Sequence, residues 1–405
     1  MRLQQAHARA LAEAGVLSAE ELADVKAGLE RIESRFAGRP CPSSPDEDLH
    51  TWVETALVDT VGGAGRKVHT ARSRNDQVAT LLRMYVIDAG ERLADALASL
   101  ARTACRRAEE WSALPMPMMT HQQFAAPGTA GFWVLRYAAA LERLRRHVLW
   151  CAAQWRRECP LGSGAVAGSS IRVDRRIQAR ELGFDGPSAS ALESTSTRDE
   201  CVELLALAAQ AALHLQSFAA DVICFSQTPL GWVRYPAEFG TGSSMMPNKR
   251  NPDAMELLRG ECCAVAAAHG QAVLLLKGLP SGYNRDLQCL KPLVRRAAEG
   301  LIRLCSLADA FLGRLEFDPD RLTESMRLGA MDATMRMEEL VRRGTPLRDA
   351  HHRVAEQVAQ GATGGRDAAA LLESYCTIGG ANPAETRGVA AALLARLTGA
   401  SEQFG

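Results

Sequence analysis

The chain has 405 residues, more than one hydrophobic core usually serves, so we expect two or three domains that share a long helical body. Its 47 basic and 47 acidic residues give a formal net charge of zero, and no basic run with interleaved aromatic residues points to nucleic acid, so we expect small molecules or copies of the chain itself as partners. The 11 cysteines are scattered without a Cys-x-x-Cys pair, which argues against a zinc ribbon and against a disulfide framework.

Apolar residues recur at helical spacing along most of the chain, as at Leu93, Leu97 and Leu100, and strand-like alternation is scarce. We therefore predict an all-α fold. Breaks rich in Gly and Pro divide it into short helices over residues 1–74, a long helical bundle carrying the polar segments over 75–323, and a small helical domain over 324–405.

We find no targeting or membrane segment in two regions that were considered for these roles, a mixed polar N-terminus and a weakly charged helix. Met1 to Ala14 lacks the basic start and continuous apolar block of a secretory signal, so we expect a cytoplasmic protein. Leu204 to Ala220 is weakly charged but short for a bilayer span, and we interpret it as a buried helix inside the bundle.

The first dense polar segment runs from His69 to Gln77 and contains a single apolar side chain, Ala71, just before a helical run. It includes Arg74 and Asn75. On composition alone, a solvated turn that caps a helix explains it as well as a binding site does.

A second polar segment, Met119 to Gln123, places His121 after a loop broken by prolines and beside an expected helix start. A lone histidine in such a position is more often structural than catalytic. Further along, Gly162 and Gly164 allow close approach of the backbone within the segment Pro160 to Ala165, and the segment Thr195 to Asp199 is also polar.

The stretch from Thr241 to Pro252 combines hydroxyl groups, the Lys249 cation and a predicted helix start. Asn251 is suited to cap that helix and Pro252 to occupy its first position, so free amides there would face an anion. Glycines before Ser243 allow the loop to move. We predict a loop that closes over a small dicarboxylate; for the Gly-Ser-Ser element alone, a simple capping loop is the alternative.

A last polar segment runs from Lys277 to Gln288 and is followed by Lys291. By composition it is either a binding segment or a polar connection between two helices.

Several of these segments resemble those of a known family. Gly242 to Asn251 resembles the Gly-Ser-Ser-x-Met-Pro-x-Lys-x-Asn motif of the fumarase/aspartase superfamily at every fixed position. His69 to Gln77 resembles a segment of argininosuccinate lyases and departs only at Ala71, and Asp46 to His50 with Glu54 is similar to the acidic segment before it. With the other polar segments, the resemblance extends from about His7 to Val354, and the chain is identified as a member of that family.

The resemblance implies a fumarase/aspartase-like bundle and a lyase that cleaves argininosuccinate to arginine and fumarate by α,β-elimination, as in arginine biosynthesis. Ser243 is then the base on a mobile loop, and His121, oriented by Glu256, assists departure of the guanidinium nitrogen. No metal and no organic cofactor is needed. The family also implies a homotetramer whose sites are each assembled from segments of three subunits.

The substrate-binding residues that the resemblance implies come from all the polar segments. Asn75 and Thr120 hold the succinyl portion, Lys249 and Asn251 hold the carboxylate on which charge develops, and Tyr283, Gln288 and Lys291 grip the amino-acid end. His69 and Arg74 complete the substrate-binding set.

The chain also departs from the family. We expect the family's N-terminal arm to be missing, and Gln4 stands where a substrate-touching serine is usual. Family residues are also replaced at four other positions, namely Ala126, Cys289, Leu290 and Met335. These changes fall on supports and on substrate selection, which leaves two alternatives open: a fumarate-releasing lyase for another N-succinyl amine or amino acid, and a catalytically silent relative resembling lens crystallins.

Overall fold

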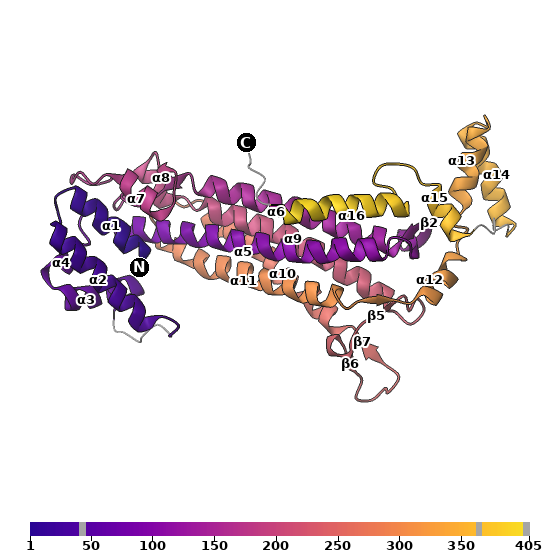
Figure 1. Cartoon of the computed structure of the whole chain (residues 1–405), viewed down its shortest axis with the longest axis horizontal. Coiled ribbons are helices and arrows are strands. Elements are labelled where there is room, and N and C mark those ends of the chain that lie inside the picture. The colour runs from indigo at the N-terminus through magenta and orange to yellow at the C-terminus, as the bar shows by residue number, and fades with distance from the viewer. Residues whose placement is uncertain (40–45, 362–366, 400–405) are drawn as a thin grey trace. The chain divides into compact units, whose positions relative to one another are not determined.

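The computed structural model describes residues 1–39, 46–361 and 367–399 (Figure 1). Helices predominate in these residues, which confirms the all-α prediction. The chain forms two compact units: unit 1 contains Met1–Glu91, Leu149–Leu204 and His269–Arg295, and unit 2 contains Arg92–Val148, Leu205–Ala268 and Arg296–Gly405. Each unit draws on separate stretches of the chain, and the predicted division at residues 74 and 323 stays a prediction.

Five long helices supply residues to the two units, and Figure 1 shows them as the long coiled ribbons. They are α5 (Arg74–Glu110), α6 (Ala130–Trp155), α9 (Asp199–Phe225), α10 (Asp253–Leu276) and α11 (Leu290–Leu312). Among the described residues, α9 alone is long and apolar enough by composition to cross a membrane, and half of its most apolar window is buried inside the protein. That burial fits the predicted core helix, because a bundle covers the apolar side chains of its central helices.

Unit 1 begins with four short helices that pack around one apolar core. They are α1 (Arg2–Glu13), α2 (Ala19–Phe36), α3 (Leu49–Val61) and α4 (Gly63–Lys67). Leu11, Leu29 and Leu57 lie at the centre of this core and are almost fully buried. Helix α2 starts at a capping box, in which the Ser18 hydroxyl accepts from the Glu21 amide at 3.1 Å and the Glu21 carboxylate accepts from the Ser18 amide at 2.9 Å.

The rest of unit 1 consists of short elements that carry polar loops. These are β3 (Glu158–Cys159), α7 (Arg175–Leu182), β4 (Gly186–Pro187), α8 (Ala191–Ser196) and the 3₁₀ turn η2 (Arg285–Cys289). Strands β3 and β4 pair in parallel. The Arg175 guanidinium holds the loop after β3 by bonding to the Leu161 carbonyl at 3.0 Å and to the Ser163 hydroxyl at 2.9 Å.

Unit 2 has an aromatic core in which the Trp133 ring contacts Phe218, Phe225 and Phe317. Its short strands form three antiparallel pairs: β1 (Pro115–Thr120) with β2 (Gln123–Thr129), β5 (Val233–Arg234) with β8 (Glu316–Phe317), and β6 (Thr241–Gly242) with β7 (Arg250–Asn251). The other elements are η1 (Ala237–Phe239), α12 (Pro319–Met326), α13 (Ala333–Arg342), α14 (Leu347–Ala359), α15 (Ala368–Glu373) and α16 (Pro383–Thr398).

His7, on α1, is a buried histidine that the fold keeps neutral. Its Nε2 donates to the Thr70 carbonyl at 2.9 Å, and its Nδ1 accepts from the Gln178 amide at 2.6 Å. Burial and the nearby Arg72 charge lower the pKa of His7 to about 3. Its pKa in the unfolded chain is about 6.5, so the unfolded state binds more protons over the interval between these values.

We expect stability to fall as the pH is lowered through this interval, because protons then favour unfolding. The loss from His7 alone is about 2 kcal/mol between pH 7 and pH 5. Denaturant unfolding at both pH values measures it, and His7→Gln should flatten the dependence, whereas His351→Gln, at an exposed position on α14, should not. An unchanged pH dependence in His7→Gln would contradict the assignment.

Candidate functional site

In unit 1 the polar segment 69–77 is organised around the carboxylate of Glu54. One oxygen of Glu54 accepts from His69 Nδ1 and Arg72 Nη2, both at 3.1 Å, and from Arg74 Nη1 at 3.3 Å. Burial raises the pKa of Glu54, but the hydrogen bond from His69 and the charges around it lower that pKa below its ordinary value. The carboxylate is therefore anionic at neutral pH and holds the segment together.

Arg74, a predicted substrate-binding residue, is bonded to protein groups on several sides. Its Nε lies 3.2 Å from the Asp48 carboxylate, its Nη2 donates to the Thr51 hydroxyl at 3.0 Å, and its Nη1 donates to the Gln77 side-chain oxygen at 2.5 Å. In this arrangement Arg74 fastens the start of α5 to α3. Its predicted contact with substrate is not tested by these contacts and stays a prediction.

Asn75, at the first turn of α5, meets the glycine-containing loop after β3. Its side-chain Nδ2 donates to the Ala165 carbonyl at 3.1 Å. Next to it, the buried Asp76 carboxylate accepts from the backbone amides of Ser73, Gly162 and Gly164 at 3.0, 2.9 and 2.9 Å. Burial raises the pKa of Asp76 to about 6, although these amides and the Arg72 charge lower it. Sequence reasoning missed Asp76, although its place beside Asn75 in the segment marked it as a polar candidate.

The segment 277–291 lies in the same unit. The Gln288 amide donates to the Tyr283 hydroxyl at 2.5 Å, and the Gly282 amide donates to the Ser196 hydroxyl at 2.6 Å, which joins this segment to the predicted polar segment 195–199. Lys291 is half-buried on the first turn of α11. Burial and the Arg198 charge lower its pKa, while Asp48 raises it. Asn75, Tyr283, Gln288 and Lys291 thus all belong to unit 1, and their predicted binding of substrate stays a prediction.

In unit 2 Ser243 sits on an exposed loop between β6 and β7. Its Oγ accepts from the backbone amides of Met245 at 3.2 Å and Met246 at 3.0 Å. Two N–H donors directed at one hydroxyl oxygen stabilise the negative charge that forms when the hydroxyl ionises. Lys249 lies exposed on the same loop.

The start of the helix after this loop differs from the prediction. Asn251 belongs to strand β7 and pairs with Thr241, and α10 begins at Asp253, so the expectation that Asn251 caps this helix is wrong. The Pro252 carbonyl accepts the first helical hydrogen bonds from Met255 and Glu256. The Asp253 carboxylate accepts from the Thr241 amide and hydroxyl at 2.6 Å each, and these bonds tie the start of α10 to strand β6.

His121 occupies the turn of the β1–β2 hairpin, with φ +54°, and Gln122 follows with φ +61°. The predicted helix start beside it is therefore wrong. Positive φ at both central residues matches the right-handed twist of a two-residue hairpin, and at His121 this conformation is strained. The His121 side chain is exposed. Thr120 is the last residue of β1 and is exposed.

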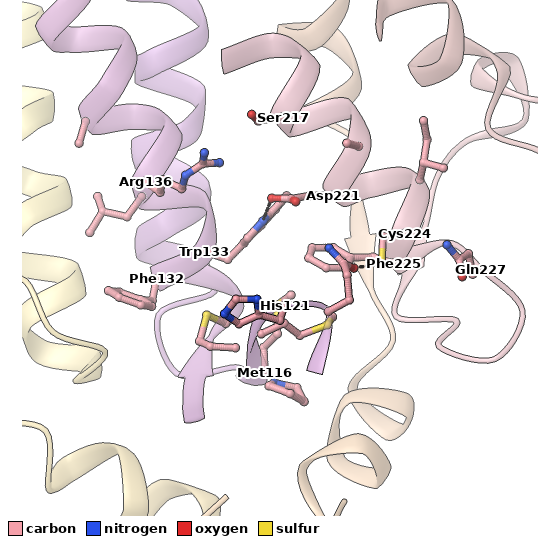
Figure 2. Close-up of a pocket in the computed structure, with 18 of the residues that line it drawn as sticks. Met116, His121, Phe132, Trp133, Arg136, Ser217, Asp221, Cys224, Phe225 and Gln227 are labelled. Carbon is pink, nitrogen blue, oxygen red and sulfur yellow. Dashed lines mark hydrogen bonds between the residues drawn. The ribbon is translucent and has the colours of Figure 1, made fainter. Parts of the chain in front are cut away.

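A cavity of about 930 Å³ lies beside this hairpin (Figure 2). Met116, His121 and Arg259 are among its lining residues. Figure 2 shows the Trp133 indole directed at the Asp221 carboxylate, which accepts from Trp133 Nε1 at 2.9 Å and from the Tyr137 hydroxyl at 2.5 Å. Sequence reasoning did not identify this cavity, because its wall is largely apolar.

Glu256, the predicted partner of His121, is exposed on the first turn of α10. In the part of the chain that the structure describes, no hydrogen bond or ion pair joins Glu256 to His121. In the same part, no group of three or more metal-ligating side chains gathers to hold an ion.

Three comparisons with known proteins place this geometry in context. Residues 1–267 match a family model described as lyase. The chain is 39% identical to an argininosuccinate lyase of Koribacter versatilis (strain Ellin345) over 354 residues, which cover 87% of this chain and 76% of that protein. It is 40% identical to an argininosuccinate lyase of Roseiflexus sp. (strain RS-1) over 356 residues, which cover 88% of this chain and 78% of that protein.

Among solved structures, EDDS lyase in complex with formate has a TM-score of 0.86 and 23% identity, covering 98% of this chain and 85% of that chain. At this identity the likeness establishes the fold alone.

Proposed function

The chain belongs to the argininosuccinate lyase family, within the fumarase/aspartase superfamily, and from that premise we propose that it cleaves argininosuccinate to arginine and fumarate. The observation that carries the mechanism is the pair of amide donors on Ser243 Oγ. A serine can remove a carbon-bound proton only if its alkoxide is stabilised, and these two donors supply part of that stabilisation.

The difficult step is removal of the proton beside a carboxylate, because negative charge then accumulates on that carboxylate. Lys249, on the same loop as Ser243, and Asn251, on the adjoining strand β7, stabilise this charge. His121 assists departure of the guanidinium nitrogen, with Glu256 orienting the imidazole. Asn75 and Thr120 hold the succinyl portion, and His69 and Arg74 support it.

At the other end of the substrate, Tyr283, Gln288 and Lys291 bind the carboxylate and amino groups of the arginine portion. The Tyr283–Gln288 hydrogen bond and the half-buried Lys291 cation support this role. A lysine in a partly dry site attracts a carboxylate more strongly than one in water does.

We propose that the protein works as a homotetramer in the cytoplasm, with each site built from several subunits. Two features of a single chain support this assembly. The Ser243 loop is exposed although proton abstraction by a serine needs a dry site, and α10 carries exposed apolar side chains, such as Leu257 at 66% and Leu274 at 74%. In such an assembly Glu256 can also reach His121 across a subunit boundary, which fits the absence of a Glu256–His121 hydrogen bond or ion pair among the residues of one chain that the structure describes.

Another N-succinyl compound is the second candidate substrate. The contacts of Gln4 are the reason to test it. Gln4 is buried, and its side-chain oxygen accepts from Arg72 Nη1 at 2.5 Å, so it serves a structural contact where a substrate-touching serine is usual in the family. Cys289 is exposed and Leu290 is fully buried, so neither replaces the acidic groups expected there.

The test is a substrate panel read by the ultraviolet absorbance of fumarate. We expect turnover of argininosuccinate and at least about 100-fold lower kcat/KM for N-succinyl amines that lack the arginine carboxylate and amino groups, because polar groups in the site are then left unpaired. Turnover of another N-succinyl compound alone would move the assignment to that substrate. A folded protein that turns over none of them would be a silent relative.

A further inference from the structure

Asp76 joins two segments that are far apart in the sequence. Its side chain is 0% exposed. One carboxylate oxygen accepts from the Ser73 amide before α5, and the other accepts from the amides of Gly162 and Gly164 in the loop after β3. Two backbone N–H groups that converge on one oxygen form a small anion-binding concavity, and here the anion is a side chain of the protein itself.

The loop after β3 makes a tight turn that requires glycine at two positions. Gly162 and Gly164 have φ of +85° and +62°, and a Cβ on Gly164 would lie 2.5 Å from the Gly168 carbonyl oxygen. The Gly168 amide donates back to the Ser163 carbonyl at 2.8 Å and closes the turn. Asp76 and Arg175 thus hold the base of the loop, while its tip, from Ala165 onward, is exposed.

The tip touches two segments of the proposed substrate site. The Ala165 carbonyl accepts from Asn75 Nδ2, and Val166 Cγ2 lies 4.0 Å from the position that a Cβ on Gly282 would occupy, beside Tyr283. A carbonyl can only accept, so it fixes which end of the Asn75 amide is the NH₂ group. One N–H is used by Ala165, and the second remains for a ligand.

We propose that Asp76 is a positioning residue for the succinyl end of the substrate. Its carboxylate holds the Gly162–Gly164 turn in place, and this turn fixes the position of the Ala165 carbonyl. That carbonyl in turn orients the Asn75 amide toward a ligand carboxylate. This inference rests on the proposed function, because it takes Asn75 to bind the succinyl portion. The glycine loop then contributes to substrate recognition through a backbone carbonyl and not through a side chain.

Asp76→Asn tests it with little change in volume. The new side chain has one oxygen and one NH₂ group, so it cannot accept from Ser73 and from the two glycines at once, and the loop loses its anchor. We expect fumarate to bind about tenfold more weakly, as measured by calorimetry on the full chain. Asp318→Asn is the matched control, because Asp318 is an N-cap at the start of α12, and fumarate affinity should not change.

A second variant breaks the same contact from the loop side. Gly164→Ala forces the turn to shift, so it should also weaken fumarate binding about tenfold and carries the test if Asp76→Asn does not fold by circular dichroism. In an Asn75→Ala background, both changes should alter fumarate affinity by less than about twofold, because the amide they orient is gone.

The outcomes separate this inference from the proposed function. A wild-type protein that binds fumarate and cleaves argininosuccinate, together with folded Asp76→Asn and Gly164→Ala variants of unchanged affinity, overturns the role of Asp76 and leaves the lyase assignment intact. Equal losses with and without the Asn75 side chain overturn it too, because they indicate a general structural effect. A wild-type protein that neither binds fumarate nor releases it from any compound of the substrate panel overturns the proposed function, and this inference with it.

Discussion

Replacing Ser243 with alanine is expected to lower kcat for argininosuccinate cleavage by about 10³-fold, since proton transfer to or from a positioned side chain contributes about 10²–10⁴-fold. Alanine removes the hydroxyl oxygen to which the amides of Met245 and Met246 donate. The KM should change far less than kcat, because the proposed carboxylate contacts of Lys249 and Asn251 remain.

The measurement is the rate of fumarate formation, followed in the ultraviolet. Ser244→Ala is the matched control, because Ser244 is the neighbouring serine of the same exposed loop. We expect it to keep at least about a tenth of the wild-type kcat, since it leaves the proton transfer in place. If Ser244→Ala were inactive and Ser243→Ala active, the base would be Ser244.

The largest expected effect on stability comes from Arg72→Met. The Arg72 side chain is 0% exposed, and it donates to the Gln4 side chain at 2.5 Å and to Glu54 at 3.1 Å. Burial lowers its pKa to about 10, so it stays cationic at neutral pH. Methionine leaves the buried Gln4 side chain without this donor and removes one of the three cationic or imidazole groups that bond to Glu54. We therefore expect a loss of about 3 kcal/mol in the free energy of unfolding.

Denaturant unfolding followed by circular dichroism measures this loss. Arg176→Met is the control, because Arg176 pairs with Asp174 on the surface with 80% of its side chain exposed, and surface pairs contribute little. A fully stable Arg72→Met would mean that Glu54 and Gln4 find other partners. We also expect reduced activity, because Glu54 positions His69 and Arg74.

How far the site could be predicted differs between its two halves. The loop at residues 242–251 is a continuous run, so its residues stood together in the sequence and the structure had only to show their hydrogen bonds. The helix cap at Asn251 was predicted wrongly, because the local preferences that favour a cap were outweighed by pairing with Thr241 across the hairpin. Similarly, His121 follows prolines and an irregular Met-rich run, in which the period of two that marks a strand is weak.

By itself, the sequence determined the all-α class, the long helices and the identity of the polar segments, because helical periodicity and contiguous motifs are local properties of a chain. Only the tertiary structure decided which segments meet. The Asp76 carboxylate bonds to glycines 86 and 88 residues away, and Gly282 bonds to a serine 86 residues before it. Such bonds leave no local pattern, since a buried polar group takes whichever partner the packing of distant segments brings within reach.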